Sequence, residues 1–453
     1  MAKCNRQTVQ FSSLGRRRVE ANWNGGRLAS DGGGVILREV DHRVGLIAAI
    51  NGCIADPRDA GRIVHDQETL LRQRVFGIAL GYEDLNDHAT LRTDPMLQLA
   101  AEQPADESRP LGSAPTLCRL ENRVTREEAF AINRVFVEQF IASHATPPEE
   151  LVLDFDATDD QLHGSQEGRF FHGYYDHYCY LPLYVFCGEQ LLAAYLRPSK
   201  IDGAKHGWAI LSLLVRRFRE VWPDVRIVMR ADSGFCRWRM LRWCDRHNVQ
   251  YIIGLATNAV LTRMAAPLAA EAKAAYETTH EKQRLFGEIV YAAATWDRPR
   301  RVVVKAERLP EGPNTRFVVT NLPGEPQHLY DRGYCQRGEM ENRIKEQQLD
   351  LFADRTSCHG FAANQFRLLL SSAAYVLIEA LRRLGLRGTE FARAQAGTIR
   401  ERLLKIGVRV RATTRRIVLY FASGYPWKAL FETVVARLRR APSAASPHVI
   451  DTG

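Results

Sequence analysis

The spacing of apolar residues predicts a helical beginning to the chain. Apolar residues recur at helical intervals in residues 66–88 and again in residues 125–144. A Pro- and Ser-rich connection, residues 102–115, separates these two segments. The pattern predicts a mainly helical N-terminal region over residues 1–146.

The hydrophobic period changes after residue 146. Short apolar runs typical of buried strands alternate with amphipathic helices, and a Cys-Gly-Glu-Gln turn joins two of the runs as a hairpin. The predicted strands are 151–156, 178–186, 191–198, 225–232 and 250–256, and the predicted helices are 204–222 and 237–248. This order predicts an α/β fold, with a mixed sheet and packed helices over residues 147–256.

An insertion interrupts this unit over residues 257–333, where an Ala-rich helix precedes three predicted strands. A helix in residues 334–358 then completes the core, and a helical, basic region follows over residues 359–453. The apolar helix 361–385 within that region contains several polar and charged residues, which favour a core helix over a membrane span: Asn364, Gln365, Arg367, Glu379 and Arg382.

Charge adds a preference for a polyanionic partner. The 453-residue chain has a formal net charge of +10. Residues 382–440 alone contain fifteen Lys or Arg against three Glu, a local balance of +12, so the rest of the chain is close to neutral. Such a segment is typical of a phosphate-binding surface or of a solvated Arg-rich face. We expect no membrane association and a cytoplasmic location.

Three carboxylates are candidates for a catalytic metal site. Asp156 and Asp232 each end a predicted strand, where ligands of α/β sheets bind. Glu341 lies on the helix after the insertion. An all-oxygen set of this kind suits Mg²⁺ or Mn²⁺, and two ions would support phosphoryl transfer. Asp154 shares a strand face with Asp156, so the sequence leaves open which of the two is the ligand.

Each of these residues also has an ordinary structural interpretation. A strand-ending Asp is commonly a cap or turn residue, and a Glu four residues after an Arg commonly forms a surface ion pair. The polar stripe around Glu341 is either a solvated ladder of ion pairs or the lining of a charged site. It consists of Tyr334, Arg337, Glu341, Lys345 and Gln348.

Taken together, these residues resemble the motifs of bacterial insertion-sequence DDE transposases. Those enzymes place the first Asp in a D-x-T context, here Asp156 to Thr158, and the second Asp after a strand, here Asp232. Their Tyr-Arg-Glu-Lys signature matches Tyr334, Arg337 and Glu341. The sequence around both motifs is most similar to that of the thirteen-eighty family of insertion sequences. Gln348 departs from the signature, which has Lys at that position.

The resemblance implies an RNase H-like catalytic core and a cut-and-paste DNA transposase. Asp156, Asp232 and Glu341 would be the catalytic metal ligands for two Mg²⁺ or Mn²⁺ ions. Tyr334 and Arg337 would contact DNA beside them, and Lys345 is a candidate substitute for the missing Lys. The implied partners are terminal inverted repeats, target DNA and a second copy of the chain, in the bacterial cytosol at the nucleoid.

Two alternative functions are also compatible with the sequence. They are an RNase H-like nuclease without strand transfer and an inactive transposase-derived DNA-binding protein. Trp296 in the insertion is either a packing residue or an aromatic that stacks on a flipped base during hairpin cleavage. The terminal repeat sequence, the target preference and the oligomeric state without DNA do not follow from the sequence.

Overall fold

The computed structural model describes residues 8–440, and the chain folds into two compact units. Among the described residues, the first unit is assembled from 8–43, 56–119 and 380–440. The second is assembled from residues 44–55 and 120–379. The predicted carboxylate site lies entirely within the second unit.

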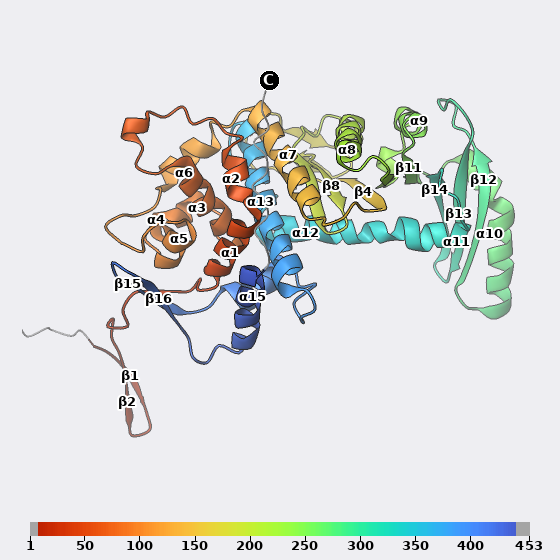
Figure 1. The fold of residues 1–453 in the computed structure, drawn as a ribbon. Coiled ribbons are helices and arrows are strands. Elements are labelled where there is room, and N and C mark those ends of the chain that lie inside the picture. The colour runs from red at the N-terminus through yellow and green to blue at the C-terminus, as the bar shows by residue number, and fades with distance from the viewer. Residues whose placement is uncertain (1–7, 441–453) are drawn as a thin grey trace, which may run out of the picture. The chain divides into compact units, whose positions relative to one another are not determined.

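An eight-stranded mixed sheet is the framework of the second unit (Figure 1). The strand order is β12-β13-β14-β11-β10-β4-β8-β9, and only β4, β10 and β11 pair in parallel. This is the mixed α/β sheet expected of an RNase H-like core. The strands are β4 (Glu150–Ala157), β8 (Leu183–Cys187), β9 (Gln190–Tyr195), β10 (Arg226–Ala231), β11 (Gln250–Leu255), β12 (Gln283–Tyr291), β13 (Arg300–Leu309) and β14 (Gly312–Thr320).

Alternation along the strands gives the sheet two different faces. Leu151, Leu153 and Phe155 of β4 are buried in the larger hydrophobic core. Because successive strand side chains point to opposite faces, Asp154 and Asp156 point to the other face. The helices that contribute to the larger core are α7 (Arg126–Ala142), α8 (Gly207–Val221), α9 (Trp238–Arg246) and α10 (Ala259–Thr279).

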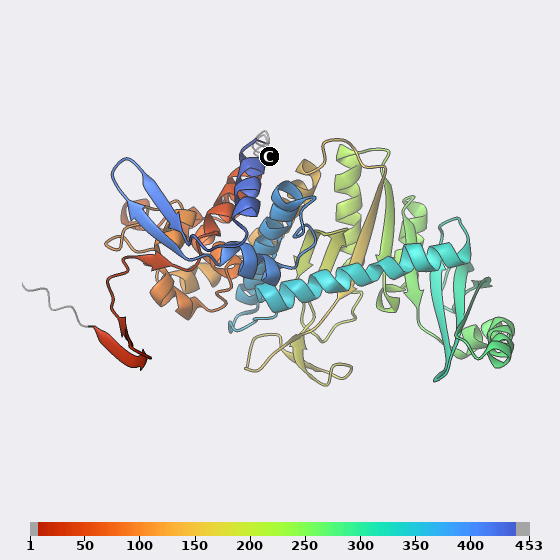
Figure 2. The same ribbon diagram turned by 90° about the horizontal axis from the view of Figure 1, so that it is seen from below.

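A long helical segment crosses the face that carries the carboxylates. Figure 2 shows it, in cyan, running across the strands. Leu329 and Tyr330 of this segment are buried in a second core with Val228 and Ile252 of the sheet. The segment changes its helical form along its length, from α11 (Pro326–His328) through a π-helical stretch (Leu329–Tyr334) and a 3₁₀ turn (Cys335–Arg337) to α12 (Gly338–Leu351).

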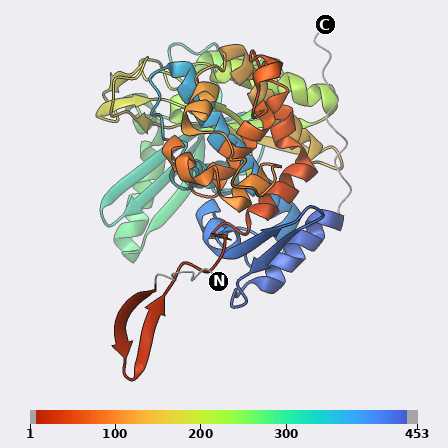
Figure 3. The same cartoon turned by 90° about the vertical axis from the view of Figure 1, so that its left-hand side faces the viewer.

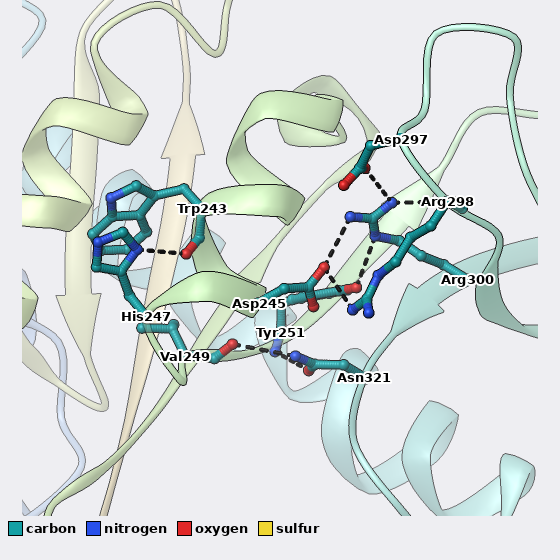
Figure 4. A network of polar contacts seen from close by, with 9 residues as sticks. All are labelled: Trp243, Asp245, His247, Val249, Tyr251, Asp297, Arg298, Arg300 and Asn321. Carbon is teal, nitrogen blue, oxygen red and sulfur yellow. Dashed lines mark hydrogen bonds and ion pairs between the residues drawn. The ribbon is translucent and has the colours of Figure 1, made fainter.

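The insertion extends the core sheet. β14 pairs antiparallel with β11, so β12, β13 and β14 continue the strands of the core. A polar network also ties the insertion to α9 and β11 (Figure 4). Arg298 and Arg300 both bind the Asp245 carboxylate at 2.8 Å, and Arg300 Nε donates to Tyr251 Oη at 3.1 Å. These contacts hold the insertion against α9 and β11 of the core.

The chain that follows β4 forms a small separate sheet in the order β5-β7-β6. The predicted strand 178–186 is in fact two strands, because Leu181 and Pro182 separate β7 from β8 and Pro cannot donate to a ladder. The remaining elements of this unit are β5 (Asp160–Gln161), β6 (Phe170–His172), β7 (His177–Tyr180), α2 (Leu46–Asn51), the 3₁₀ turn Ser233–Phe235 and most of α13 (Phe361–Leu381).

The segment Phe361–Leu386 is long and apolar enough to cross a membrane by length and composition alone. Within its most apolar window, 89% of the residues are buried inside the protein. Its buried polar residues include Asn364 and Gln365, which bond to backbone groups of Cys358 and Ala194. This is the core helix that the sequence predicts.

The first unit combines helices with two β-hairpins (Figure 3). The sequence pattern does not predict the hairpins; Gly15 and Arg16 form the turn of the first, and Arg17 begins its second strand. Its strands are β1 (Val9–Leu14), β2 (Arg17–Ala21), β3 (Leu28–Ala29), β15 (Val408–Ala412) and β16 (Ile417–Phe421). Its helices are α1 (Gly34–Val44), α3 (Gln67–Ala79), α4 (His88–Leu91), α5 (Pro95–Ala100), α6 (Ala114–Glu121), α14 (Ala396–Ile399) and α15 (Lys428–Arg440), with short turns at Ala60–Arg62, Leu85–Asp87, Arg382–Leu386 and Arg400–Leu404.

Candidate active site

Asp156 and Asp232 lie next to each other at the carboxyl ends of two parallel strands. Phe155 of β4 pairs with Ala231 of β10, so the next residue on each strand is one of the two Asp. The Asp156 Oδ1 accepts from the Ala157 amide at 3.0 Å, and the Asp232 Oδ1 accepts from the Gly234 amide at 3.0 Å. Asp232 therefore caps a turn, as the ordinary structural interpretation predicts. This role uses one carboxylate oxygen and is compatible with metal binding by the carboxylate.

Arg337 connects the sheet to the helical segment above it. Its Nη1 donates to Asp156 Oδ2 at 3.3 Å, and its Nη2 donates to Glu341 Oε1. The Glu341 side chain is 43% exposed, whereas that of Arg337 is 18% exposed. The Arg337–Glu341 pair is thus part of a carboxylate cluster that includes Asp156 on the sheet. A solvated ladder of ion pairs along one helix would not include a residue of the sheet.

The carboxylates of this cluster influence one another. Burial raises the pKa of Asp156 to about 7, and the charges of Asp232 and Glu341 also raise it, while the Arg337 guanidinium opposes the shift. Like charges raise a carboxyl pKa in this way only at close range. A site that concentrates negative charge on one partly open face is suited to a cation.

Asp154 has a different environment from Asp156. Its side chain is buried, and Arg230 binds both of its oxygens at 2.5 and 2.7 Å. A further Arg230 nitrogen donates to the Gly333 carbonyl at 2.8 Å. Both carboxylate oxygens of Asp154 are therefore engaged in a structural ion pair, which favours Asp156 as the ligand.

Tyr334 lies over the β11 strand at a point where no side chain projects. A Cβ on Gly254 would lie 2.6 Å from the Tyr334 hydroxyl and 2.9 Å from the Ser233 amide nitrogen. Burial raises the pKa of Tyr334, and the neighbouring Arg337 opposes that shift. Gly254 is thus a residue that the sequence analysis missed, although a Gly inside a predicted strand is a known sign of close approach.

Lys345 and Gln348 extend the same helix away from the cluster. Lys345 is exposed. Gln348 Nε2 donates to the Asp159 carbonyl at 3.2 Å and to Asp160 Oδ1 at 3.0 Å. The position where the signature has Lys is therefore occupied by a neutral donor to a buried acid.

The donor set fits a divalent cation by chemistry but is not arranged as a closed cage. Asp156, Asp232 and Glu341 supply only carboxylate oxygens, which hard cations such as Mg²⁺ prefer. Among residues 8–440, no three His, Cys, Asp or Glu side chains converge as metal ligands. The Arg337 guanidinium is the cation that joins Asp156 to Glu341 in this structure.

Trp296 is half-buried in the insertion. Its ring contacts Tyr291 edge-on with centroids 5.4 Å apart, and the Arg300 guanidinium lies 5.6 Å from its centre. It also packs against the larger hydrophobic core. These contacts support the packing interpretation of Trp296.

Comparison with known proteins identifies the class to which this fold and site belong. Residues 11–443 match the family model described as Transposase DDE domain group 1. The chain therefore belongs to the DDE transposase family, and it is a DNA transposase. Enzymes of this family use divalent metal ions, which agrees with the all-carboxylate donor set.

A solved structure and the curated proteins were also compared. The cryo-EM structure of a piggyBac transposase synaptic complex with hairpin DNA is similar to this chain at 10% identity and a TM-score of 0.41. That match covers 83% of this chain and 80% of the other. No curated protein matches the chain.

Proposed function

We propose that this protein is a cut-and-paste transposase that uses Asp156, Asp232 and Glu341 as its catalytic carboxylates. The observation that carries the proposal is the register of β4 and β10, which brings the two Asp together beneath Arg337 and Glu341. The sequence around these motif residues supports membership of the thirteen-eighty family of insertion sequences.

In the proposed mechanism, the carboxylates hold two Mg²⁺ or Mn²⁺ ions, which would activate the attacking oxygen and neutralise the leaving one. The remaining task of the chain is to position DNA. Arg337 is placed to contact a phosphate beside the carboxylates, Tyr334 fixes the helical segment against β11, and Lys345 is an exposed cation further along the helix. Water and then the freed 3′-hydroxyl would attack in turn at this one site.

Each region of the chain has a proposed role, either in DNA binding or in the chemistry. Residues 1–146 would recognise terminal inverted repeats, and the basic region 359–453 would bind phosphates. The core of residues 147–256 and 334–358, with the insertion 257–333, would perform the chemistry. We propose a homodimer on paired element ends, acting in the bacterial cytosol at the nucleoid.

The test is divalent-metal-dependent cleavage and joining of DNA that carries the element ends. We expect the wild-type protein to cleave and to join, and Glu341→Gln to do neither while it still binds DNA. Cleavage without joining would replace the proposal with a nuclease. Full activity of Glu341→Gln would overturn the catalytic assignment.

A further inference from the structure

The β6–β7 hairpin displays an unusual concentration of exposed aromatic rings. Phe171 is 55% exposed, Tyr178 is 44% exposed and Tyr174 at the tip is 85% exposed. Phe171 and Tyr178 are direct cross-strand partners, with ring centroids 5.7 Å apart. Phe171 and Tyr178 therefore share one outward face of the hairpin, and we call these two rings, together with Tyr174 at the tip, the aromatic face.

Cations accompany the rings. The Arg169 guanidinium lies 4.5 Å from the centre of the Tyr178 ring. On the other face of the hairpin, the Lys200 ammonium lies 5.3 Å from the centre of Phe170, a ring that is itself 37% exposed. Exposed rings interleaved with cations form the surface that proteins use for unpaired nucleic acid strands, because every base has a stacking face and every nucleotide has a phosphate.

The hairpin is anchored to the chain segment directly after Asp156. His177, on the opposite face from Tyr178, bonds Asp159 Oδ2 through its Nε2 at 2.7 Å. The Tyr175 ring lies between the hairpin tip and this anchor, with ring centroids 5.0 Å from Tyr174 and 6.1 Å from His177. The Asp159 carbonyl in turn accepts from Gln348 Nε2 of α12 at 3.2 Å, which ties the base of the hairpin to the helix that carries Glu341.

We propose that the aromatic face binds unpaired nucleotides of the DNA strand that leaves the carboxylate site, by stacking bases on Phe171, Tyr174 and Tyr178. The proposal rests on the assignment of Asp156 to the active site. It gives the hairpin a function in holding a melted strand end, separate from the chemistry. The surface does not distinguish between base types, so the interaction would be independent of sequence.

The test compares single-stranded oligothymidylate with a duplex of the same length as binding probes. We expect the double variant Phe171→Ala/Tyr178→Ala to bind the single strand at least about tenfold more weakly, with duplex affinity unchanged. Quenching of a 2-aminopurine placed in the single strand should fall in parallel. Tyr178→Phe, which keeps the ring, should retain both signals.

Phe130→Ala is the matched control, because Phe130 is 52% exposed on α7 and has no place in the proposal. Equal losses on both probes, or no loss on the single strand, would overturn the inference. So would a change confined to the oligomeric state, which would make the aromatic face a protein interface. Metal-dependent cleavage by Glu341→Gln separately reports failure of the catalytic assignment, since that variant keeps the aromatic face.

Discussion

The carboxylate site of the second unit and the two hairpins of the first unit use charge in opposite ways. In the second unit, the site charges are held by specific partners: Arg337 joins Asp156 to Glu341, and Arg230 binds both oxygens of Asp154. In the first unit, the hairpins carry arginines that are exposed to solvent rather than buried in a carboxylate cluster. They are Arg16, Arg17, Arg18, Arg409, Arg411, Arg415 and Arg416.

This difference matches two separate requirements of a DNA transposase. Phosphoryl transfer needs oxygens held in a fixed arrangement, so each of the proposed catalytic carboxylates would be irreplaceable. Affinity for a phosphate backbone adds up over many contacts, so each arginine is partly dispensable. Substitutions at the carboxylate site and in the hairpins should therefore have different effects. The following predictions test that contrast in order of decreasing effect on DNA cleavage.

The largest effect should come from Asp156→Asn. Removal of a proposed metal ligand should lower the rate of metal-dependent cleavage by about a thousandfold or more, as happens when groups that act on the transition state are lost. Stability should not fall, because the substitution removes a carboxyl group whose charged form is disfavoured by burial and, further, by the charges of Asp232 and Glu341. Cleavage kinetics and chemical denaturation measure the two quantities. Wild-type cleavage by this variant would contradict the assignment of Asp156.

Asp154→Asn should give the reverse pattern and is the natural control. The Asn would leave the buried Arg230 guanidinium without its counter-charge, and breaking a buried ion pair from one side costs about 3–5 kcal/mol of folding free energy. Denaturant unfolding should show that loss, while the folded fraction retains metal binding. Unchanged stability with abolished metal binding would instead make Asp154 the ligand.

The sequence predicts the residues of the carboxylate cluster because its signals are local. Strand-ending Asp residues, an i,i+4 Arg–Glu pair and alternating hydrophobicity follow from short-range periodicity. The Arg230–Asp154 pair was missed because it depends on the parallel register of β4 and β10, which only the tertiary fold determines. The extension of the core sheet by β14 was missed for the same reason.

The first unit was less predictable. β1 and β2 are exposed at every residue, so no buried face produces a clear alternation, and the Arg-rich turn resembles a disordered basic stretch. The basic C-terminal region was predicted to be helical, yet it contains the β15–β16 hairpin. The β-branched residues Val408, Val410, Ile417 and Val418 are the signal that favours strands there.

Substitutions at the β15–β16 turn should weaken DNA binding without affecting the chemistry. The double variant Arg415→Ala/Arg416→Ala should bind duplex DNA at least about tenfold more weakly, and the slope of log affinity against log salt should fall by about one per lost phosphate contact. Cleavage at saturating protein should stay normal. Arg415→Lys/Arg416→Lys, which keeps the charge, is the control. An unaltered salt slope in the Ala variant would remove this hairpin from the DNA surface.

The smallest effect on DNA cleavage concerns Asp160, a fully buried acid next to the site. Burial raises its pKa to about 8, Gln348 donates to one oxygen, and the other oxygen has no hydrogen-bond partner among the described residues. Between the unfolded pKa, near 4, and the folded pKa, the folded protein holds a proton that the unfolded chain releases. This group therefore makes stability fall as pH rises through that window, by up to about 1.4 kcal/mol per pH unit.

Asp160→Asn should remove that slope, because the amide is neutral at every pH and can still accept from Gln348. Denaturation midpoints measured from pH 4 to 9 should converge for the two proteins at the acidic end and separate at the basic end, with the variant more stable. The same titration of Arg415→Ala/Arg416→Ala should retain the wild-type slope, since those arginines stay charged throughout. A variant that loses stability equally at every pH would mean that Asp160 is ionised and paired, and that Gln348 stabilises a charge as the signature Lys would.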